Sequence, residues 1–311
     1  MVPWAGVMSP PLSSLETLCA LDPGARGIAG LVIPGALDRA ARSLARARRV
    51  VLVTGFVPQP GSAAETDGPS GTVVLGRALR RLGASVRYLA DPPVLPILRA
   101  CLRALGEPRD LLPVPGLTAA AATVAARLCA DFGPTHLIAI ERPGRAADGG
   151  YYNLRGRSVA ALNAPLDRLF VRPLPGVETI GVGDGGNEIG MGRVRAGVCR
   201  DVPRGARIAS VVRTDHLVVA GTSNWGAWGL AAALGLLAGR DLLHTSAEEQ
   251  RLTRAMIAAG AVDGVTGARR PSVDNLSPGV HRALLETMRE LTIHFMAGRA
   301  QLPRAGQQET A

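Results

Sequence analysis

Short apolar runs recur along the chain, and each is followed by a stretch with helical periodicity. This alternation constrains the fold more than any other feature of the sequence. The first run, 50–54, is mostly β-branched, which suits a strand buried on both faces of a sheet. Strands that alternate with helices of about a dozen residues form βαβ units, so we predict a three-layer α/β fold with a mainly parallel sheet and helices on both faces. The other predicted strands are 85–90, 136–140, 178–182, 207–212 and 216–220.

The organisation of the chain favours one large domain. Helical periodicity predicts helices over 34–47 and 71–82, and a helix, a short strand and a second helix within 93–131. The C-terminal part is helical, with amphipathic stretches at 247–259 and 278–297. No low-complexity linker or internal repeat divides the sequence. We therefore expect an N-terminal segment over 1–33, a single α/β domain over 34–300 and a disordered tail over 301–311.

The formal net charge of +10 at pH 7 suggests a nucleic-acid partner at first sight. However, all 35 basic residues are arginines scattered along the chain, so they form no single basic face. The 4 cysteines lack metal-ligand spacing, which favours a reducing compartment, and the N-terminus has no basic segment followed by an apolar one. We therefore expect a cytoplasmic, bacterial-type chain with no signal peptide and no nucleic-acid partner.

One charge-free stretch, 217–239, has the length of a membrane span. It is rich in glycine and is interrupted by Thr222, Ser223 and Asn224. We therefore interpret it as a buried strand, a polar turn and a buried helix over 225–238 that is capped by Ser223 or Asn224. This interpretation predicts no membrane partner.

Polar residues gather in the loops that follow predicted strands, which is where α/β folds build their sites. The loop after 50–54 contains Glu65, Thr66 and Asp67 just before a helix. The acids can bind an amine or a metal ion, and the helix N-terminus can bind an anion. The alternative is that Asp67 or Ser70 only caps the helix.

The loop after 136–140 combines Tyr151, Tyr152, Asn153 and Arg155 in a chain that has only 3 tyrosines. Arg155 can grip a carboxylate through two parallel hydrogen bonds, and a tyrosine hydroxyl can orient that carboxylate or relay a proton. An ordered surface loop with its own internal hydrogen bonds is the alternative.

The loop after 178–182 is rich in glycine and contains Asp184, Asn187 and Glu188. Its two acids can act as an acid–base pair or ligate a hard cation through oxygen. The loop after 216–220 places Ser223 and Asn224 at a helix start, where a carboxylate or an oxyanion can bind. Helix capping beside a buried tryptophan accounts equally well for that last loop.

These four loops, in this order, resemble the D-glutamate cyclase family, which includes the C-terminal domain of the vertebrate mitochondrial enzyme and stand-alone bacterial relatives. Two long segments of unusual composition carry the resemblance, at 148–156 (Asp-Gly-Gly-Tyr-Tyr-Asn-Leu-Arg-Gly) and 183–192 (Gly-Asp-Gly-Gly-Asn-Glu-Ile-Gly-Met-Gly). Asn275 departs from the pattern, because glycine is expected after Val-Asp. The resemblance covers about residues 15–298, with shorter matches at 53–56, 65–68, 141–142, 223–226, 262–267 and 273–274.

The resemblance implies an α/β fold and a lyase that dehydrates D-glutamate intramolecularly to 5-oxo-D-proline and water. This reaction needs a base, an acid, a carboxylate clamp and enforced proximity. We expect Asp184, Glu188 and Tyr152 to be catalytic, with Asp184 and Glu188 as candidate ligands of a divalent cation, Mg²⁺ or Mn²⁺. The expected substrate-binding residues are Glu65 and Asp67 for the ammonium, Arg155, Ser223 and Asn224 for the carboxylates, and Thr66, Tyr151, Asn153 and Asn187 around them.

Two other functions fit the same loops. A protein that binds an acidic amino acid without catalysis would use them without a titrating Glu188. An NAD-dependent oxidoreductase would use the G-x-G-x-x-G pattern beginning at Gly181, although Asp201 is badly placed for a ribose. We expect no cofactor beyond the divalent cation and a small acidic D-amino acid as the partner; self-assembly into a homo-oligomer stays open.

Overall fold

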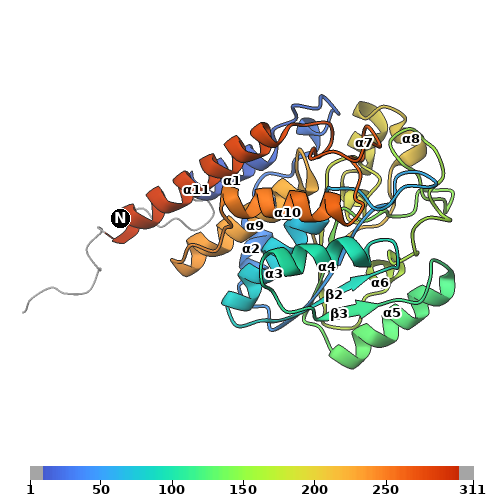
Figure 1. Ribbon diagram of the computed structural model, residues 1–311, viewed down its shortest axis with the longest axis horizontal. Helices are drawn as coiled ribbons and strands as arrows, with labels where there is room; N and C mark the ends of the chain where they lie inside the picture. The colour runs from blue at the N-terminus through green and yellow to red at the C-terminus, as the bar shows by residue number, and fades with distance from the viewer. Residues whose placement is uncertain (1–9, 301–311) are drawn as a thin grey trace, which may run out of the picture.

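A six-stranded sheet with the strand order β3-β2-β1-β4-β5-β6 organises the chain in the computed structural model, which describes residues 10–300. Every neighbouring pair of strands is parallel. Helices cover both faces of this sheet, which confirms the predicted three-layer α/β class (Figure 1). The strands are β1 (Arg49–Thr54), β2 (Ser85–Ala90), β3 (Leu111–Pro113), β4 (His136–Ile140), β5 (Glu178–Gly183) and β6 (His216–Val219).

One face of the sheet carries two tiers of helices. Val50 and Leu52 of β1 belong to the large apolar core on this face. The helices that form the inner tier are α2 (Ala36–Leu44), α3 (Pro69–Arg81) and α9 (Ser223–Ala238). The outer tier packs on these helices and consists of α1 (Pro10–Cys19), α4 (Leu95–Ala104), α10 (Ser246–Ala258) and α11 (Pro278–Ala300).

The opposite face has a thinner cover. Val51 and Val53 alternate with the β1 residues above and belong to a smaller core with α5 (Ala119–Phe132) and α6 (Arg168–Val171). Burial of successive residues on opposite faces explains why residues 50–53 of β1 are all apolar. A third apolar cluster joins β6 to η1 (Ala29–Leu31), α7 (Arg195–Asp201) and α8 (Gly205–Ile208).

Two local predictions are wrong. The segment 207–212, which was predicted to be a strand, begins instead in the short helix α8. Its buried residues Ile208, Ala209 and Val212 are spaced as on one face of a helix, but so short an apolar segment also fits a strand. The cap of α9 is not Ser223 or Asn224. Thr222 caps this helix by accepting the backbone N–H of Trp225, because α9 begins at Ser223.

The charge-free stretch 217–239 forms β6 and the buried helix α9, as predicted. Across residues 10–300, no helix combines the length and the apolar character that a bilayer span requires. The N-terminal helix α1 packs against α9 and α11. The tail predicted over 301–311 lies outside the described residues, and the domain boundaries stay predictions.

Candidate active site

A cavity of about 120 Å³ opens at the carboxyl edge of the sheet, where β1, β4 and β5 end. Open α/β sheets bind their ligands at this edge. The volume is below the roughly 300–1,000 Å³ of sites for drug-sized molecules, so it suits one small metabolite. The lining residues are Arg26, Phe56, Pro58, Gln59, Glu65, Glu141, Asn153, Leu154, Arg155, Asp184, Asn187, Glu188, Gly264, Val265 and Asp274.

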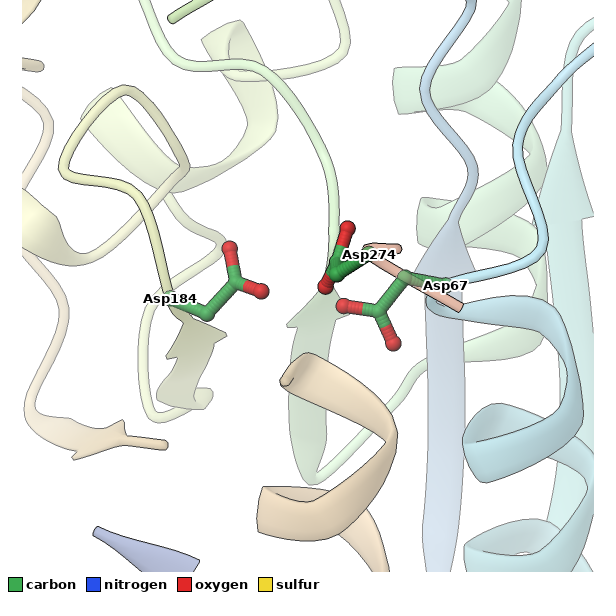
Figure 2. A group of neighbouring side chains, drawn as sticks. All are labelled: Asp67, Asp184 and Asp274. Atoms are coloured by element: carbon green, nitrogen blue, oxygen red, sulfur yellow. The ribbon is translucent and has the colours of Figure 1, made fainter. Parts of the chain in front are cut away.

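Carboxylates from distant parts of the chain converge here. Figure 2 shows Asp67, Asp184 and Asp274 with their carboxyl groups turned toward one another. One oxygen from each lies within 4.8 Å of the others, and the same holds for Glu141, Asp184 and Glu188. Asp184 therefore belongs to both groups and stands at the centre of the acidic cluster.

Arg26 supplies the positive charge beside this cluster. Its Nη2 atom lies 2.8 Å from Asp184 Oδ2 and 3.4 Å from Asp274 Oδ2, and it also donates to the carbonyl of Gly221. A turn closed by Asp22, which accepts the backbone N–H of Arg26 at 3.0 Å, holds the N-terminal segment over the site. The guanidinium thus bridges two facing carboxyl groups.

Burial changes the protonation of the paired acids. It raises the pKa of Asp274 to about 8 and that of Asp184 to about 6, although Arg26 opposes both shifts. An oxygen of one carboxyl group lies within 4.8 Å of an oxygen of the other. Near neutral pH the pair therefore holds about one proton.

Two glutamates on the cavity wall are similarly affected. Burial, followed by the charge of Asp274, raises the pKa of Glu65 well above its ordinary value. Burial, followed by the charge of Asp184, does the same for Glu141. The cavity thus contains more carboxyl groups than can be ionised together.

The glycine-rich loop after β5 fixes its own polar side chains. The two carboxylate oxygens of Glu188 accept the backbone N–H groups of Gly185 and Gly186, each at 2.8 Å. Asn187 donates through Nδ2 to the carbonyl of Tyr152 at 2.8 Å. Its Oδ1 atom is buried on the cavity and has no hydrogen-bond partner within residues 10–300. This oxygen is available to a ligand.

The start of α9 binds a carboxylate of the protein itself. Asp67 accepts the backbone N–H groups of Ser223 and Asn224 at 2.7 and 2.8 Å. The hydroxyl of Ser223 donates to Glu141 at 2.7 Å. Asn224 Oδ1 accepts the backbone N–H groups of Gly68 and Gly71. Ser223 and Asn224 therefore position Asp67 and Glu141, and they do not line the cavity.

The loop after β4 that contains Tyr151 and Tyr152 has some residues on the cavity and others away from it. Tyr151 donates to Asp167 at 2.6 Å and Tyr152 donates to Asp148, both away from the lining. Asn153 and Arg155 line the cavity. Arg155 is exposed at its mouth, with one contact of 2.8 Å from Nη2 to the carbonyl of Val265.

The remaining expected residue, Thr66, ties the loop after β1 to the segment that carries Asp274. Its hydroxyl donates to the carbonyl of Ser272 at 2.8 Å. Thr66 is fully buried and does not line the cavity. Thr66 therefore joins two segments of the site and does not contact the cavity.

Three charged residues of the cavity were not among the site residues expected from the sequence. Glu141 directly follows the strand 136–140, and a polar residue directly after a predicted strand is a signal for a site residue. Asp274 lies in a short segment of the family resemblance, beside the departure at Asn275. Arg26 carries no sequence signal at all, because only the fold brings it to β5.

Comparison with known proteins identifies the family. The family model described as "D-glutamate cyclase-like, C-terminal" matches residues 15–289. Human "D-glutamate cyclase, mitochondrial" is 40% identical over 241 residues, which are 73% of this chain and 39% of the human protein, so the chain spans about two fifths of that relative's length. An exopolyphosphatase-related protein from Bacteroides fragilis aligns with 86% of this chain and 61% of its own, at 10% identity and a TM-score of 0.43. The resemblance seen in the sequence is confirmed: the chain belongs to the D-glutamate cyclase-like family.

Proposed function

We propose that this chain dehydrates D-glutamate to 5-oxo-D-proline, as an intramolecular lyase. The observation that carries the proposal is the small cavity in which buried carboxyl groups face one another, with Arg26 paired to two of them. Because these acids cannot all ionise, a proton donor and a proton acceptor lie side by side. The name of the human relative supports the choice of D-glutamate as substrate.

Ring closure joins the amine nitrogen of glutamate to its γ-carboxyl carbon. The ammonium group gives up two protons, and one γ-oxygen leaves with them as water, so no net proton is consumed. The protein must therefore accept two protons from nitrogen, one after the other, and deliver two to the leaving oxygen. It must also fold the flexible substrate, and such enforced proximity reaches effective molarities of about 10⁵–10⁸ M.

We assign the two proton transfers to Asp184 and Asp274. Ionised Asp184 accepts a proton from the ammonium group, and protonated Asp274 delivers one to the departing oxygen. A proton then passes from Asp184 to Asp274, which restores the pair, and the same cycle moves the second proton from nitrogen to the leaving water. Arg26 keeps the two carboxyl groups facing each other. We choose Asp274 in place of Glu188 as the partner of Asp184, because Arg26 pairs with both aspartates, whereas each Glu188 oxygen already accepts a backbone N–H group of its own loop. Tyr152 has no part in it, since its hydroxyl pairs with Asp148.

The rest of the lining matches the parts of a folded glutamate. Glu65 and the free Oδ1 of Asn187 accept hydrogen bonds from the ammonium group. Arg155 at the mouth binds the α-carboxylate. Leu154 and Val265 cover the methylene carbons. Asp67 does not contact the substrate in this arrangement, because backbone N–H groups at the start of α9 bind its carboxylate behind the lining residues.

The acidic cluster also fits a divalent cation. Its donors are all carboxylate oxygens, the type that Mg²⁺ and Mn²⁺ prefer. Asp184 would hold the ion together with Asp67 and Asp274, or together with Glu141 and Glu188. When bound there, such an ion would neutralise acidic charge and would supply Lewis-acid polarisation of a carboxyl oxygen.

An NAD-dependent oxidoreductase is not favoured. In that class a helix after the glycine-rich turn receives the pyrophosphate. Here β5 is followed by a loop that returns to the sheet, and a side chain at Gly181 would lie 2.5 Å from the carbonyl oxygen of Ile189. The next element is the three-residue helix η2 (Met191–Arg193), which is too short for that role.

The decisive experiment incubates the purified chain with D-glutamate or L-glutamate, with and without Mn²⁺, and follows 5-oxoproline by chiral chromatography. The proposal predicts 5-oxo-D-proline from D-glutamate in at least one metal condition. Saturable binding of glutamate without turnover would favour an acidic amino-acid binding protein instead. Turnover of neither enantiomer would refute the cyclase assignment.

A further inference from the structure

A second cavity of about 280 Å³ lies between α10 and the segment that leads into α11. It shares no lining residue with the active-site cavity. The two are nevertheless adjacent, because Val273 lines the second cavity and its neighbour Asp274 lines the first. A ligand here would contact the segment that carries an active-site acid.

Buried polar groups form the inner wall of this second cavity. Glu249 is 6% exposed and pairs with His244 through Oε2 at 2.7 Å. Its Oε1 atom accepts only a 3.4 Å hydrogen bond from Thr253. His281 is also buried on the lining, and its Nδ1 accepts the indole N–H of Trp225 at 2.8 Å. The Glu249 carboxylate thus retains capacity to accept a further hydrogen bond.

Two arginines stand at the rim without partners. Arg254 of α10 and Arg282 of α11 are exposed and line the cavity. Neither guanidinium makes an ion pair or a hydrogen bond with another residue in the 10–300 range. By contrast, Arg289, further along α11, pairs with Asp241 at 2.9 Å. Two free guanidinium groups beside one cavity provide fork-shaped donors for carboxylates.

We infer that this second cavity is a binding site for an acidic amino acid. The ammonium group of the ligand binds Glu249, and its two carboxylates bind Arg254 and Arg282. One negative and two positive side chains give the lining a net charge of +1, which a ligand of net charge −1 neutralises. A simple dicarboxylate would leave the free acceptor capacity of the Glu249 Oε1 atom unused, and an amino acid with one carboxylate would leave one arginine unpaired. This binding does not depend on turnover in the first cavity.

The test titrates L-glutamate and, separately, D-glutamate into the purified chain by calorimetry and tryptophan fluorescence. The fluorescence reports on this site because Trp225 contacts His281 and Trp228 packs 5.1 Å from His244, measured between ring centroids. The variant is Arg254→Gln/Arg282→Gln, whose altered side chains are exposed. The matched control is Arg251→Gln, which changes an exposed arginine of the same helix outside the cavity.

The inference predicts saturable binding of at least one enantiomer with a change in tryptophan emission. In Arg254→Gln/Arg282→Gln this affinity falls tenfold or more, and in Arg251→Gln it is unchanged. The absence of saturable binding for both enantiomers would overturn the inference. Isotherms that shift by less than threefold in Arg254→Gln/Arg282→Gln would overturn it as well, because the ligand would then occupy another site.

Discussion

At the scale of single residues, the site depends on how deeply its acids are buried and on how few cations accompany them. Asp184 and Asp274 face each other beside Arg26, and burial raises the pKa of each carboxyl group. An exposed pair of aspartates would be fully ionised near neutral pH and could not supply a proton. The fold thus converts two ordinary acids into a donor and an acceptor.

The pH dependence of turnover follows from this pair. We predict that kcat/KM for D-glutamate rises as pH passes about 6, where Asp184 ionises, and falls as pH passes about 8, where Asp274 loses its proton. Initial rates of 5-oxoproline formation in a series of buffers measure this profile. A rate that stays flat through both pH values would contradict the assigned roles.

The same shifts predict how stability depends on pH. A carboxyl group whose pKa is raised in the folded state binds protons more tightly there than in the unfolded chain, where aspartate titrates near pH ~4. The contribution of Asp274 to stability is therefore present at low pH and is lost as pH rises toward about 8. We expect Asp274→Asn to make the free energy of unfolding, measured with urea, less dependent on pH across that window.

The control for this stability prediction is Asp131→Asn, which changes an exposed acid of α5. Its free energy of unfolding should follow the wild-type pH dependence. If Asp274→Asn also follows the wild-type curve, the carboxyl group of Asp274 is not the buried, protonated group that we describe.

Gly264 leaves room for the carboxyl group of Glu65. A Cβ atom at this position would lie 1.9 Å from Glu65 Oε2. We predict that Gly264→Ala displaces this carboxyl group and lowers kcat/KM for D-glutamate by about 100-fold, the size expected for a misplacement of about 1 Å. Gly298→Ala is the matched control, because no atom lies within 4 Å of the added methyl group and activity should be retained. Equal activities of the two variants would exclude a role for the Glu65 position.

At the scale of elements, the site is assembled by the first turn of α9. Backbone N–H groups at this helix start hold Asp67, and the Asn224 side chain holds the loop before α3. Asn224 also donates to the carbonyl of Thr66 at 3.2 Å. One buried amide thus joins two elements that are far apart in the sequence.

We predict that Asn224→Ala lowers the free energy of unfolding by about 3 kcal/mol, because buried backbone groups of the loop lose their partner at about 1–3 kcal/mol each. Turnover of D-glutamate should fall as well, since the loop also carries Glu65 and Asp67. Denaturation in urea and the 5-oxoproline assay measure the two effects. A loss of stability below about 0.5 kcal/mol would show that the amide does not join these elements.

The elements themselves were largely predictable from the sequence. The strands 85–90 and 136–140 have the predicted bounds. Residues 137–140 form the continuous apolar run that a strand buried on both faces requires. The segment 207–212 was not predictable, because its few apolar residues fit a helix and a strand equally well. Tertiary packing decides such a case, and the sequence does not contain that information locally.

The candidate site was predictable only where it lies in loops after strands. Glu65, Asp184 and Glu188 were found in this way, and all three line the cavity. Arg26 comes from the N-terminal segment and Asp274 from the connection between α10 and α11, so neither follows a strand. Their positions depend on long-range packing against α9 and β5, which periodicity and composition do not report.

At the scale of the whole molecule, the distribution of charge matters more than its sum. The chain has a formal net charge of +10, yet the candidate active-site cavity is lined mainly by acids among its charged residues. The arginines around this cavity attract an anionic substrate over a distance, while the acids act on it after it binds. The absence of a nucleic-acid partner stays a prediction from the scattered arginines.

A divalent cation should stabilise the whole fold if the acidic cluster holds it. We predict that Mn²⁺ raises the melting temperature of the chain and that a chelator reverses the effect, because a ligand that binds only the folded state adds about 2.7 kcal/mol at 100 times its dissociation constant. Asp184→Asn should abolish this increase, since Asp184 belongs to both carboxylate groups. Asp131→Asn should retain it. The same increase in both variants would place the ion elsewhere.

The central claim is that the buried acidic cavity performs the ring closure. The most direct test measures 5-oxo-D-proline formed from D-glutamate by the wild-type chain, by Asp184→Asn and by Asp131→Asn under identical conditions. We predict turnover by the wild-type chain and by Asp131→Asn, and a loss of about 100-fold or more in Asp184→Asn, which is the usual size of a general acid–base contribution. Wild-type turnover that persists undiminished in a folded Asp184→Asn variant would contradict the claim.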